Sequence, residues 1–340
     1  MPVSAADVIN PAIDHTAGQL FRPFRLGQWT RLAVTGILAG ELGSMGGCSF
    51  QIPSLPRTNP NSQDFLAQLI PPQSVLIVVA IVILVLAGVA LLIGLMYVSS
   101  VMRFVLFDSV VARECHIRRF WSNRRRPGFR YFVWQLLFTA AMMAVFVLIA
   151  GAGAAVVFGF GWFRNPREHL IALILCGVVF FIVFIAFVVT ALVIAVLTKD
   201  FVVPQMALED ISAIEGWRRL WAMMNTEKAR YAGYVGMKIL LSIAGAIGVG
   251  IAAFIVILAL LVPTGVVGLG AFLGGRALGL VWNAFTISAA VVAGSGALAV
   301  MLYAVVLVSV PVMVFFPAYS LYFFAPRYQP LNILMHPPGV

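Results

Sequence analysis

The stretch from Ser74 to Val98, SVLIVVAIVILVLAGVALLIGLMYV, contains no charged side chain. As a helix rising about 1.5 Å per residue, it is longer than the roughly 30 Å hydrocarbon core of a bilayer. Backbone amide groups inside that core have no water to bind, so they must pair within the segment, as they do in a helix. The stretch therefore predicts a transmembrane helix, and this limits what the rest of the chain can be.

Apolar runs of this kind recur along the chain, at 74–99, 131–161, 170–197, 232–262 and 284–316. Of the 340 residues, 62% are apolar and only 10% are charged, whereas about a quarter of the residues in a soluble domain are charged. The mean hydropathy is +1.03. We therefore expect an all-α, polytopic membrane protein, with one membrane domain over residues 1–340.

A sixth span is expected at 31–48, a short, glycine-rich segment that contains Glu41. Its Gly36–Gly40 pair has the GxxxG spacing that lets transmembrane helices approach closely. A charged residue at mid-membrane costs roughly 2.5–3.5 kcal/mol on insertion scales, so a re-entrant or interfacial helix is the alternative. The prediction is six transmembrane helices.

The distribution of basic residues predicts the orientation. With six spans, seventeen Lys and Arg lie on the side that holds both termini, 100–130 and 198–231. The opposite side holds four, at positions 57, 164, 167 and 276. Cytoplasmic segments carry the excess of basic residues, so both termini are expected in the cytoplasm. Five spans would place the basic N-terminal arm outside. Lys238, inside the fifth run, is expected to snorkel to the basic side.

An arginine-aromatic signature occurs twice, one hundred residues apart. RRFW at 118–121 precedes Arg-Tyr at 130–131, and RRLW at 218–221 precedes Arg-Tyr at 230–231. A fainter copy keeps Leu20-Phe21 and Thr30-Arg31 at the same offset. Such repetition indicates repeated structural units. We predict three units, each an amphipathic interfacial helix followed by a transmembrane hairpin, at about 12–100, 104–198 and 201–316, with a tail at 317–340.

The interfacial helix is clearest in the third unit, where apolar side chains recur every three or four residues, at Leu208, Ile211, Ile214, Trp217, Trp221 and Met224. One apolar stripe suits a helix that lies in the headgroup plane. Asp210, and Asp108 in the second unit, are the expected N-caps. Aromatic rings with a polar tip favour the membrane interface, and four are expected to anchor there: Trp121, Trp221, Tyr131 and Tyr231.

The basic segments are the main candidate binding surface. Each cation near an anionic leaflet contributes on the order of 1 kcal/mol. The cluster could be a topology determinant with incidental lipid contact, or a specific site for an anionic lipid or an acidic partner. Nucleic acid is disfavoured because no nucleic-acid module surrounds the cluster. The candidate contacts are Arg118, Arg119, Arg124, Arg125, Arg126, Arg130, Arg218, Arg219 and Arg230.

Glu41 is a candidate functional carboxylate, because an ionisable group within a membrane span is costly and is kept for a role. The alternative is that Glu41 sits near the outer end of a short helix and reaches water. The other predicted spans hold no Asp, Glu or His in their interiors. This absence argues against a proton relay or an ion-coupled pump.

No catalytic, cofactor-binding or metal site is expected. Cys48, Cys115 and Cys176 lie far apart and form no CxxC, so neither a disulfide framework nor a zinc site is indicated. The chain has no credible GxSxG, HExxH, P-loop or dinucleotide motif. An intramembrane enzyme would need Asp108, Asp210 and His116 to meet in one cleft. We expect a protein that is not an enzyme and carries no cofactor.

Four stretches together carry a family resemblance: FRPFRLGQWTRL (21–32), GGCSFQIPS (46–54), VLFDSVVARECHIRRFW (105–121) and FVVPQMALEDISAIEGWRRLW (201–221). Over about 15–325 the chain resembles uncharacterised six-helix bacterial membrane proteins. These are similar to the membrane domain of some glycerophosphoryl diester phosphodiesterases. The resemblance implies a multi-pass protein of a bacterial inner membrane. It implies no catalytic residues, because the soluble phosphodiesterase domain is missing.

Two functions follow from these features. The leading hypothesis is a non-enzymatic membrane module that binds membrane lipids, anionic ones in particular, or a protein partner through its basic cytoplasmic face. The alternative is a transporter or lipid-translocating protein, motivated by six spans in repeated units and by Glu41.

Overall fold

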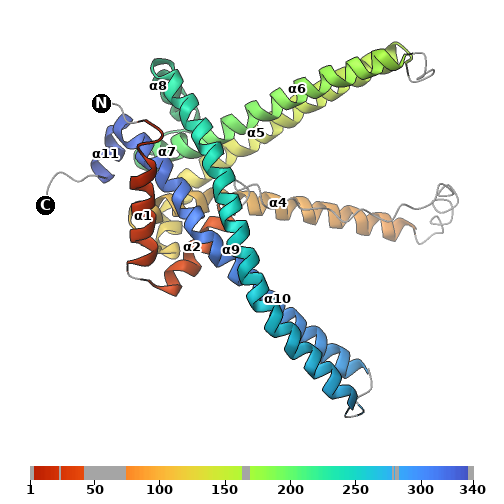
Figure 1. The fold of residues 1–340 in the computed structure, drawn as a ribbon. Coiled ribbons are helices and arrows are strands. Elements are labelled where there is room, and N and C mark those ends of the chain that lie inside the picture. The colour runs from red at the N-terminus through yellow and green to blue at the C-terminus, as the bar shows by residue number, and fades with distance from the viewer. Residues whose placement is uncertain are drawn as a thin grey trace.

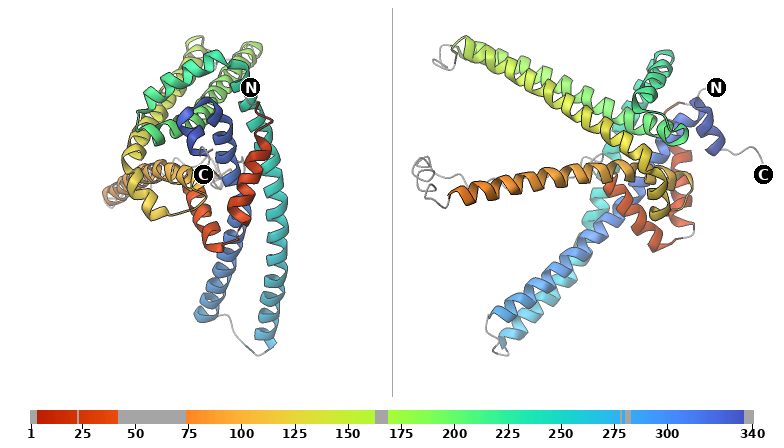
Figure 2. Two further views of the ribbon diagram at one scale, coloured as in Figure 1. Left: turned by 90° about the vertical axis from the view of Figure 1, so that its left-hand side faces the viewer. Right: turned by 180° about the vertical axis from the view of Figure 1, so that it is seen from behind.

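The computed structural model describes residues 4–22, 24–41, 74–162, 169–277, 279 and 283–335. Within these ranges the chain is helical and contains no strand. The helices converge on a hub from which three arms radiate in different directions (Figures 1 and 2). The all-α prediction is confirmed.

Five long helices form the arms and enter the hub at one end: α4 (Ser74–Val111), α5 (Ile117–Gly159), α6 (Leu170–Leu197), α9 (Lys228–Ala277) and α10 (Ala284–Phe324). The rest of the hub consists of shorter elements: α1 (Ile9–Phe21), α2 (Leu26–Leu38), η2 (Thr198–Val202), α7 (Val203–Glu209), α8 (Ala213–Thr226), η3 (Ala325–Arg327) and α11 (Gln329–Met335). One arm contains α4, another pairs α5 with α6, and the third pairs α9 with α10 (Figure 1).

The arms have the composition of membrane spans. Among the described residues, five helical segments are long and apolar enough to cross a bilayer: Val78–Val111, Ile117–Gly159, Leu170–Glu209, Lys228–Ala277 and Phe285–Arg327. Their side chains face outward, and Leu148 is 70% and Ile171 83% exposed. Such a surface is stable against lipid chains and unstable in water. This agrees with the multi-pass membrane protein that the sequence predicts.

The sixth span predicted at 31–48 is not confirmed. Helix α2 has 13 residues and ends at Leu38, which gives a length of only about 20 Å. Residues 42–48 lie outside the described part of the chain. Gly36 packs against α10, where an added Cβ would lie 2.7 Å from the Met313 sulfur, and Gly40 takes a left-handed conformation after the helix (φ 79°). The two glycines therefore serve a contact and a turn within the hub.

The separate interfacial helices are also arranged differently from the prediction. In the second unit the basic segment and the span form one continuous helix, α5, of 43 residues. In the third unit the predicted stripe is divided between α7 and α8, because Asp210 is left-handed (φ 53°) and ends α7. The N-cap of α8 is Ser212, whose hydroxyl accepts a hydrogen bond from the Glu215 amide at 3.3 Å. Asp108 lies inside α4 and caps no helix.

An aromatic cluster fills the hub between α9 and α10. Phe201 lies at its centre, with ring centroids 5.0 Å from Tyr234 and 5.2 Å from Phe324. Tyr234 also stacks on Tyr319 at 5.3 Å. Contacts of this kind join the end of the α6 span to the α9–α10 arm, since Phe201 belongs to η2.

His15 fastens α1 to the hub. Its imidazole is buried, with Nε2 2.9 Å from the Val110 carbonyl oxygen and Nδ1 3.3 Å from the Tyr322 hydroxyl. A carbonyl oxygen only accepts, so Nε2 carries the proton and Nδ1 of the neutral ring accepts from Tyr322. Burial lowers the pKa of His15, and the charge of Arg113 lowers it further, whereas the Val110 carbonyl acts in the opposite direction.

This geometry predicts a loss of stability in mild acid. Because the folded state resists protonation of His15, the unfolded state binds the proton more readily below the ordinary pKa of 6.5. Stability should fall as the pH drops from about 6.5 towards the lowered pKa of the folded state. The midpoint of thermal unfolding in detergent, measured from pH 7.5 to 5.0, should decrease less in His15→Gln than in the unaltered protein. Identical pH profiles would contradict the assignment.

Candidate functional site

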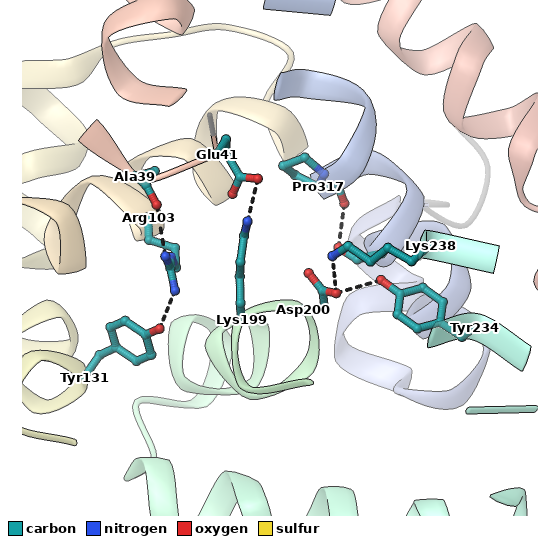
Figure 3. Close-up of polar contacts among 10 residues, drawn as sticks. Ala39, Glu41, Arg103, Tyr131, Lys199, Asp200, Tyr234, Lys238 and Pro317 are labelled. Atoms are coloured by element: carbon teal, nitrogen blue, oxygen red, sulfur yellow. Dashed lines mark hydrogen bonds and ion pairs between the residues drawn. The ribbon is translucent and has the colours of Figure 1, made fainter. Parts of the chain in front are cut away.

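Five charged side chains meet inside the hub: Glu41, Arg103, Lys199, Asp200 and Lys238 (Figure 3). They come from the end of the α2 segment, from α4, from η2 and from α9. The side chains of Glu41 and Asp200 are only 2% and 3% exposed. Burying ionised groups is costly unless they are paired and hydrogen-bonded, so the partners of each decide what the cluster is.

Lys199 and Asp200 occupy neighbouring positions of η2, a π-helical turn between α6 and α7. Single π-turns within α-helices are rare, and those that occur are often found at functional sites. From this turn Lys199 extends towards Glu41, while Asp200 faces Lys238 and Tyr234 (Figure 3). Two adjacent residues thus serve two different ion pairs.

Each charge has a specific partner. Lys199 Nζ donates to Glu41 Oε2 at 2.5 Å. The Asp200 carboxylate accepts from Lys238 Nζ and from the Tyr234 hydroxyl, the latter at 2.9 Å. The pairs connect α9, η2 and the segment after α2, so that charged contacts link two arms to the N-terminal helices.

Arg103 supplies the third polar connection. Its guanidinium donates to the Ala39 carbonyl oxygen at 2.9 Å and to the Tyr131 hydroxyl (Figure 3). These bonds tie α4 to the end of α2 on one side and to α5 on the other. The cluster is therefore shared by all three arms.

A small cavity of about 30 Å³ lies between these groups, lined by Glu41, Arg103, Lys199 and Asp200 together with residues such as Pro317 and Ser320. This volume admits about two water molecules, far below the roughly 300–1,000 Å³ of sites for organic ligands. The cluster can therefore hold water but not a solute of metabolite size.

The sequence-based interpretation of this region needs correction. Glu41 does not reach water at the outer end of a short helix, because it is buried at the hub, where it pairs with Lys199. Lys238 does not snorkel: it is bound by Asp200, a residue that the sequence places in a loop between spans. A lysine within an apolar run implies a buried acidic partner, but the run itself does not identify which acid.

Five of the nine candidate arginines bind acidic side chains of the hub. Arg124 makes a bidentate pair with Asp108, at 2.7 and 2.8 Å, and also donates to the Ala207 carbonyl oxygen at 2.5 Å. Arg130 binds the backbone and side chain of Asp210. The other three pairs are Arg218 with Glu215, Arg219 with Glu209 and Glu215, and Arg230 with Glu227. Arg124, Arg130 and Arg219 thereby join different hub elements, whereas Arg218 and Arg230 pair with acids three residues away in the chain, and Arg218 is still 78% exposed.

The other four candidates, Arg118, Arg119, Arg125 and Arg126, are exposed on the first turns of α5. They form none of the ion pairs found within the described ranges. The structure thus separates the basic segment into arginines that hold the hub together and arginines that face outward.

The outward arginines border two adjoining grooves. One, of about 530 Å³, is lined by Val98, Met102, Ile117, Arg118, Trp121, Ser122 and Arg125. The other, of about 680 Å³, is lined by Arg31, His116, Ile117, Arg118, Arg119 and Ser122. Because they share Arg118, Ile117 and Ser122, they form one surface, called here the α4–α5 groove. Its apolar end lies against α4, and its basic end lies at the start of α5.

The four predicted interfacial anchors divide into two pairs. Trp121 is half-buried, with its ring edge-on to Tyr97, and Trp221 is 60% exposed. Tyr131 and Tyr231 are buried inside the hub and cannot anchor at the membrane interface. They lie on the inner faces of α5 and α9, where they pack against Phe104 and Phe201 respectively.

The three residues that an intramembrane enzyme would require each bind a different side chain. Asp108 binds Arg124 and Asp210 binds Arg130, while His116 lies 3.8 Å from Glu114 at the surface. In the part of the chain that the structure covers, no three His, Cys, Asp or Glu side chains form a group that could hold a metal ion. Cys115 is buried and Cys176 lies on the α5–α6 arm, and Cys48 falls outside the described residues.

Residues 3–334 match the model of a family of unknown function, DUF7544. The chain belongs to this family. No curated protein and no solved structure matches it. A relationship to the membrane domain of phosphodiesterases is therefore without support. The match begins before α1 and ends within α11, so the family is defined by the hub and the arms together.

The buried pair predicts a double-mutant effect. Glu41→Gln should leave the Lys199 ammonium buried without its carboxylate, at a cost of about 3–5 kcal/mol of folding free energy. Lys199→Met in the same chain should restore most of that loss, because the second change removes the unpaired charge. Denaturant unfolding of both variants in detergent measures the effect. A single variant as stable as the unaltered protein would contradict the pairing.

Proposed function

We propose that this protein is a non-enzymatic, multi-pass protein of a bacterial inner membrane that binds anionic phospholipids at the basic face of its hub. The α4–α5 groove carries the proposal. It joins an apolar end formed by Val98, Met102 and Trp121 to a basic end that includes Arg118 and Arg119. A phospholipid has the same division between acyl chains and phosphate.

A lipid would be held as follows. The acyl chain would lie along α4 beside Val98 and Met102, where the helix leaves the arm and enters the hub. The phosphate would lie between Arg118 and Arg125, at the height where Trp121 favours the interface. Arginine suits phosphate because its planar guanidinium donates two parallel hydrogen bonds. A second negative charge on the headgroup would be met by Arg119 or Arg31.

The proposed orientation places the hub in the cytoplasm. The outward arginines, and Arg22, Arg25 and Arg31 of the N-terminal segment, lie at the hub, whereas Arg276 lies at the opposite end of α9. Glu41 lies in the hub, and α4 begins at Ser74 and reaches the hub core with its later residues, from Val98 onward. An even number of crossings, with both termini cytoplasmic, fits these positions and the positive-inside rule.

The arginine contribution can be measured directly. Arg118→Gln with Arg125→Gln should lower the retention of anionic lipid roughly thirtyfold, since two cations contribute about 2 kcal/mol. Native mass spectrometry after exchange into mixed phosphatidylglycerol and phosphatidylcholine nanodiscs measures that retention. Arg218→Gln with Arg276→Gln removes the same charge away from the groove and serves as the control.

Retention equal to that of the control pair would refute the proposal. Co-purification of a stoichiometric acidic protein, released by the groove variant but not by the control, would replace the lipid by a protein partner. Arg124 is left intact because it binds Asp108 within the hub, so its loss would disturb the fold itself.

Transport remains the second proposal, and one observation favours it. The Glu41–Lys199 and Asp200–Lys238 pairs lie at a π-turn beside a water-sized cavity, and buried ionised groups at helix breaks recur in transporters. Proteoliposomes should then show flux of protons or a small ion that Glu41→Gln abolishes. Glu41→Gln with Lys199→Met separates lost transport from lost folding, and absence of flux over a broad ion panel would argue against transport.

A further inference from the structure

A second groove is formed by other helices of the hub. It has a volume of about 490 Å³ and is formed where α6, α8 and α9 meet, lined by Val193, Leu197, Trp221, Met224, Asn225, Lys228, Tyr231, Ala232 and Val235. We call it the α8–α9 groove. No residue of the α4–α5 groove belongs to it, so its properties can be argued independently.

The two grooves are built alike. In each, part of the wall comes from a span where it reaches the hub, Val98 and Met102 of α4 in one and Val193 and Leu197 of α6 in the other. In each, a tryptophan closes the groove, and these are Trp121 and Trp221, one hundred residues apart. The repeated sequence signature therefore coincides with a repeated surface.

The charges of the two grooves differ. Asn225 stands where the first copy has Arg125, and Arg218, the counterpart of Arg118, binds Glu215 and does not line the second groove. Lys228 is the cation among its lining residues. The neighbouring Glu227 carboxylate is occupied by Arg230 and Arg327, at 3.2 and 2.9 Å.

Tyr231 gives the groove a polar group that lacks a partner. The residue is 2% exposed and lines the groove, yet its hydroxyl has no hydrogen-bond partner within the described residues. Its counterpart Tyr131 differs, because the Tyr131 hydroxyl accepts from Arg103. Buried polar groups are nearly always hydrogen-bonded. The hydroxyl has almost no accessible surface of its own, so a ligand oxygen accepts from it only where the groove widens at Tyr231.

We infer that the α8–α9 groove is a second phospholipid site, with a headgroup preference different from that of the first. Its apolar wall and Trp221 take the acyl chain, Lys228 binds the phosphate, and Tyr231 donates to a phosphate or ester oxygen. With a single cation in the lining, the site accepts zwitterionic as well as anionic phospholipids. The inference rests on the proposed function in one respect: the part of the hub that carries this groove is taken to lie at the height of the lipid headgroups.

The test is the number and class of phospholipids that remain bound to the full-length protein. Native mass spectrometry after exchange into equimolar phosphatidylglycerol and phosphatidylcholine should detect two tightly bound lipids per chain. Lys228→Gln with Tyr231→Phe should weaken one of them at least tenfold and leave the anionic one in place. Tyr231→Phe removes no hydrogen bond found among the described residues, so the fold should survive. Lys199→Gln is avoided because it would break a hub ion pair, and Tyr303→Phe on the exposed part of α10 is the control.

The outcomes separate the two proposals. If the Arg118 and Arg125 variant loses one lipid and the Lys228 and Tyr231 variant loses the other, both sites exist. If only the Lys228 and Tyr231 variant loses a lipid, the proposed function fails and the second site stands. If that variant retains every lipid of the unaltered protein, or if the groove holds only detergent, a free fatty acid or a polypeptide, the inference is overturned.

Discussion

The pairing of buried charges at the hub is the constraint on which the rest of the structure depends. The arms diverge beyond the hub, so contacts between different arms are concentrated where the charges lie (Figures 1 and 2). Asp200 joins the α6 helix to Lys238 of α9, Lys199 joins it to Glu41, and Arg103 joins α4 to α5. Apolar packing between helices is non-directional, whereas each ion pair specifies one partner.

This arrangement also explains the two kinds of arginine in the basic segments. Arg124 reaches Asp108 of α4, and Arg130 reaches Asp210 at the end of α7 from another side of α5. Arg118 and Arg125 lie on another face of the same helix and line the groove. Helical periodicity of 3.6 residues per turn distributes one run of positive charge between a structural and an outward-facing role.

Hydropathy predicted the spans well but predicted helix ends poorly. The run at 170–197 coincides with α6, and 74–99 begins with α4 at Ser74. However, α4 continues to Val111 and α5 begins at Ile117, because a helix does not stop where its surroundings change from lipid to water. Its end is set by local conformations such as the left-handed Asp210. The positive charge of the basic segments could be predicted from the sequence. The ion pairs inside the hub could not, because partners such as Lys199 and Glu41 lie 158 positions apart in the chain.

The π-turn at Thr198–Val202 has a geometric consequence for the α5–α6 arm. Helices α6 and α7 are a single rod that contains one residue more than regular winding requires. In a regular α-helix one additional residue would rotate α6 by about 100° relative to the hub. The wider π-turn takes up that residue within a single turn, so the face of α6 that meets α5 is preserved although the chain is one residue longer. The rotational phase of a whole arm therefore depends on the shape of one turn.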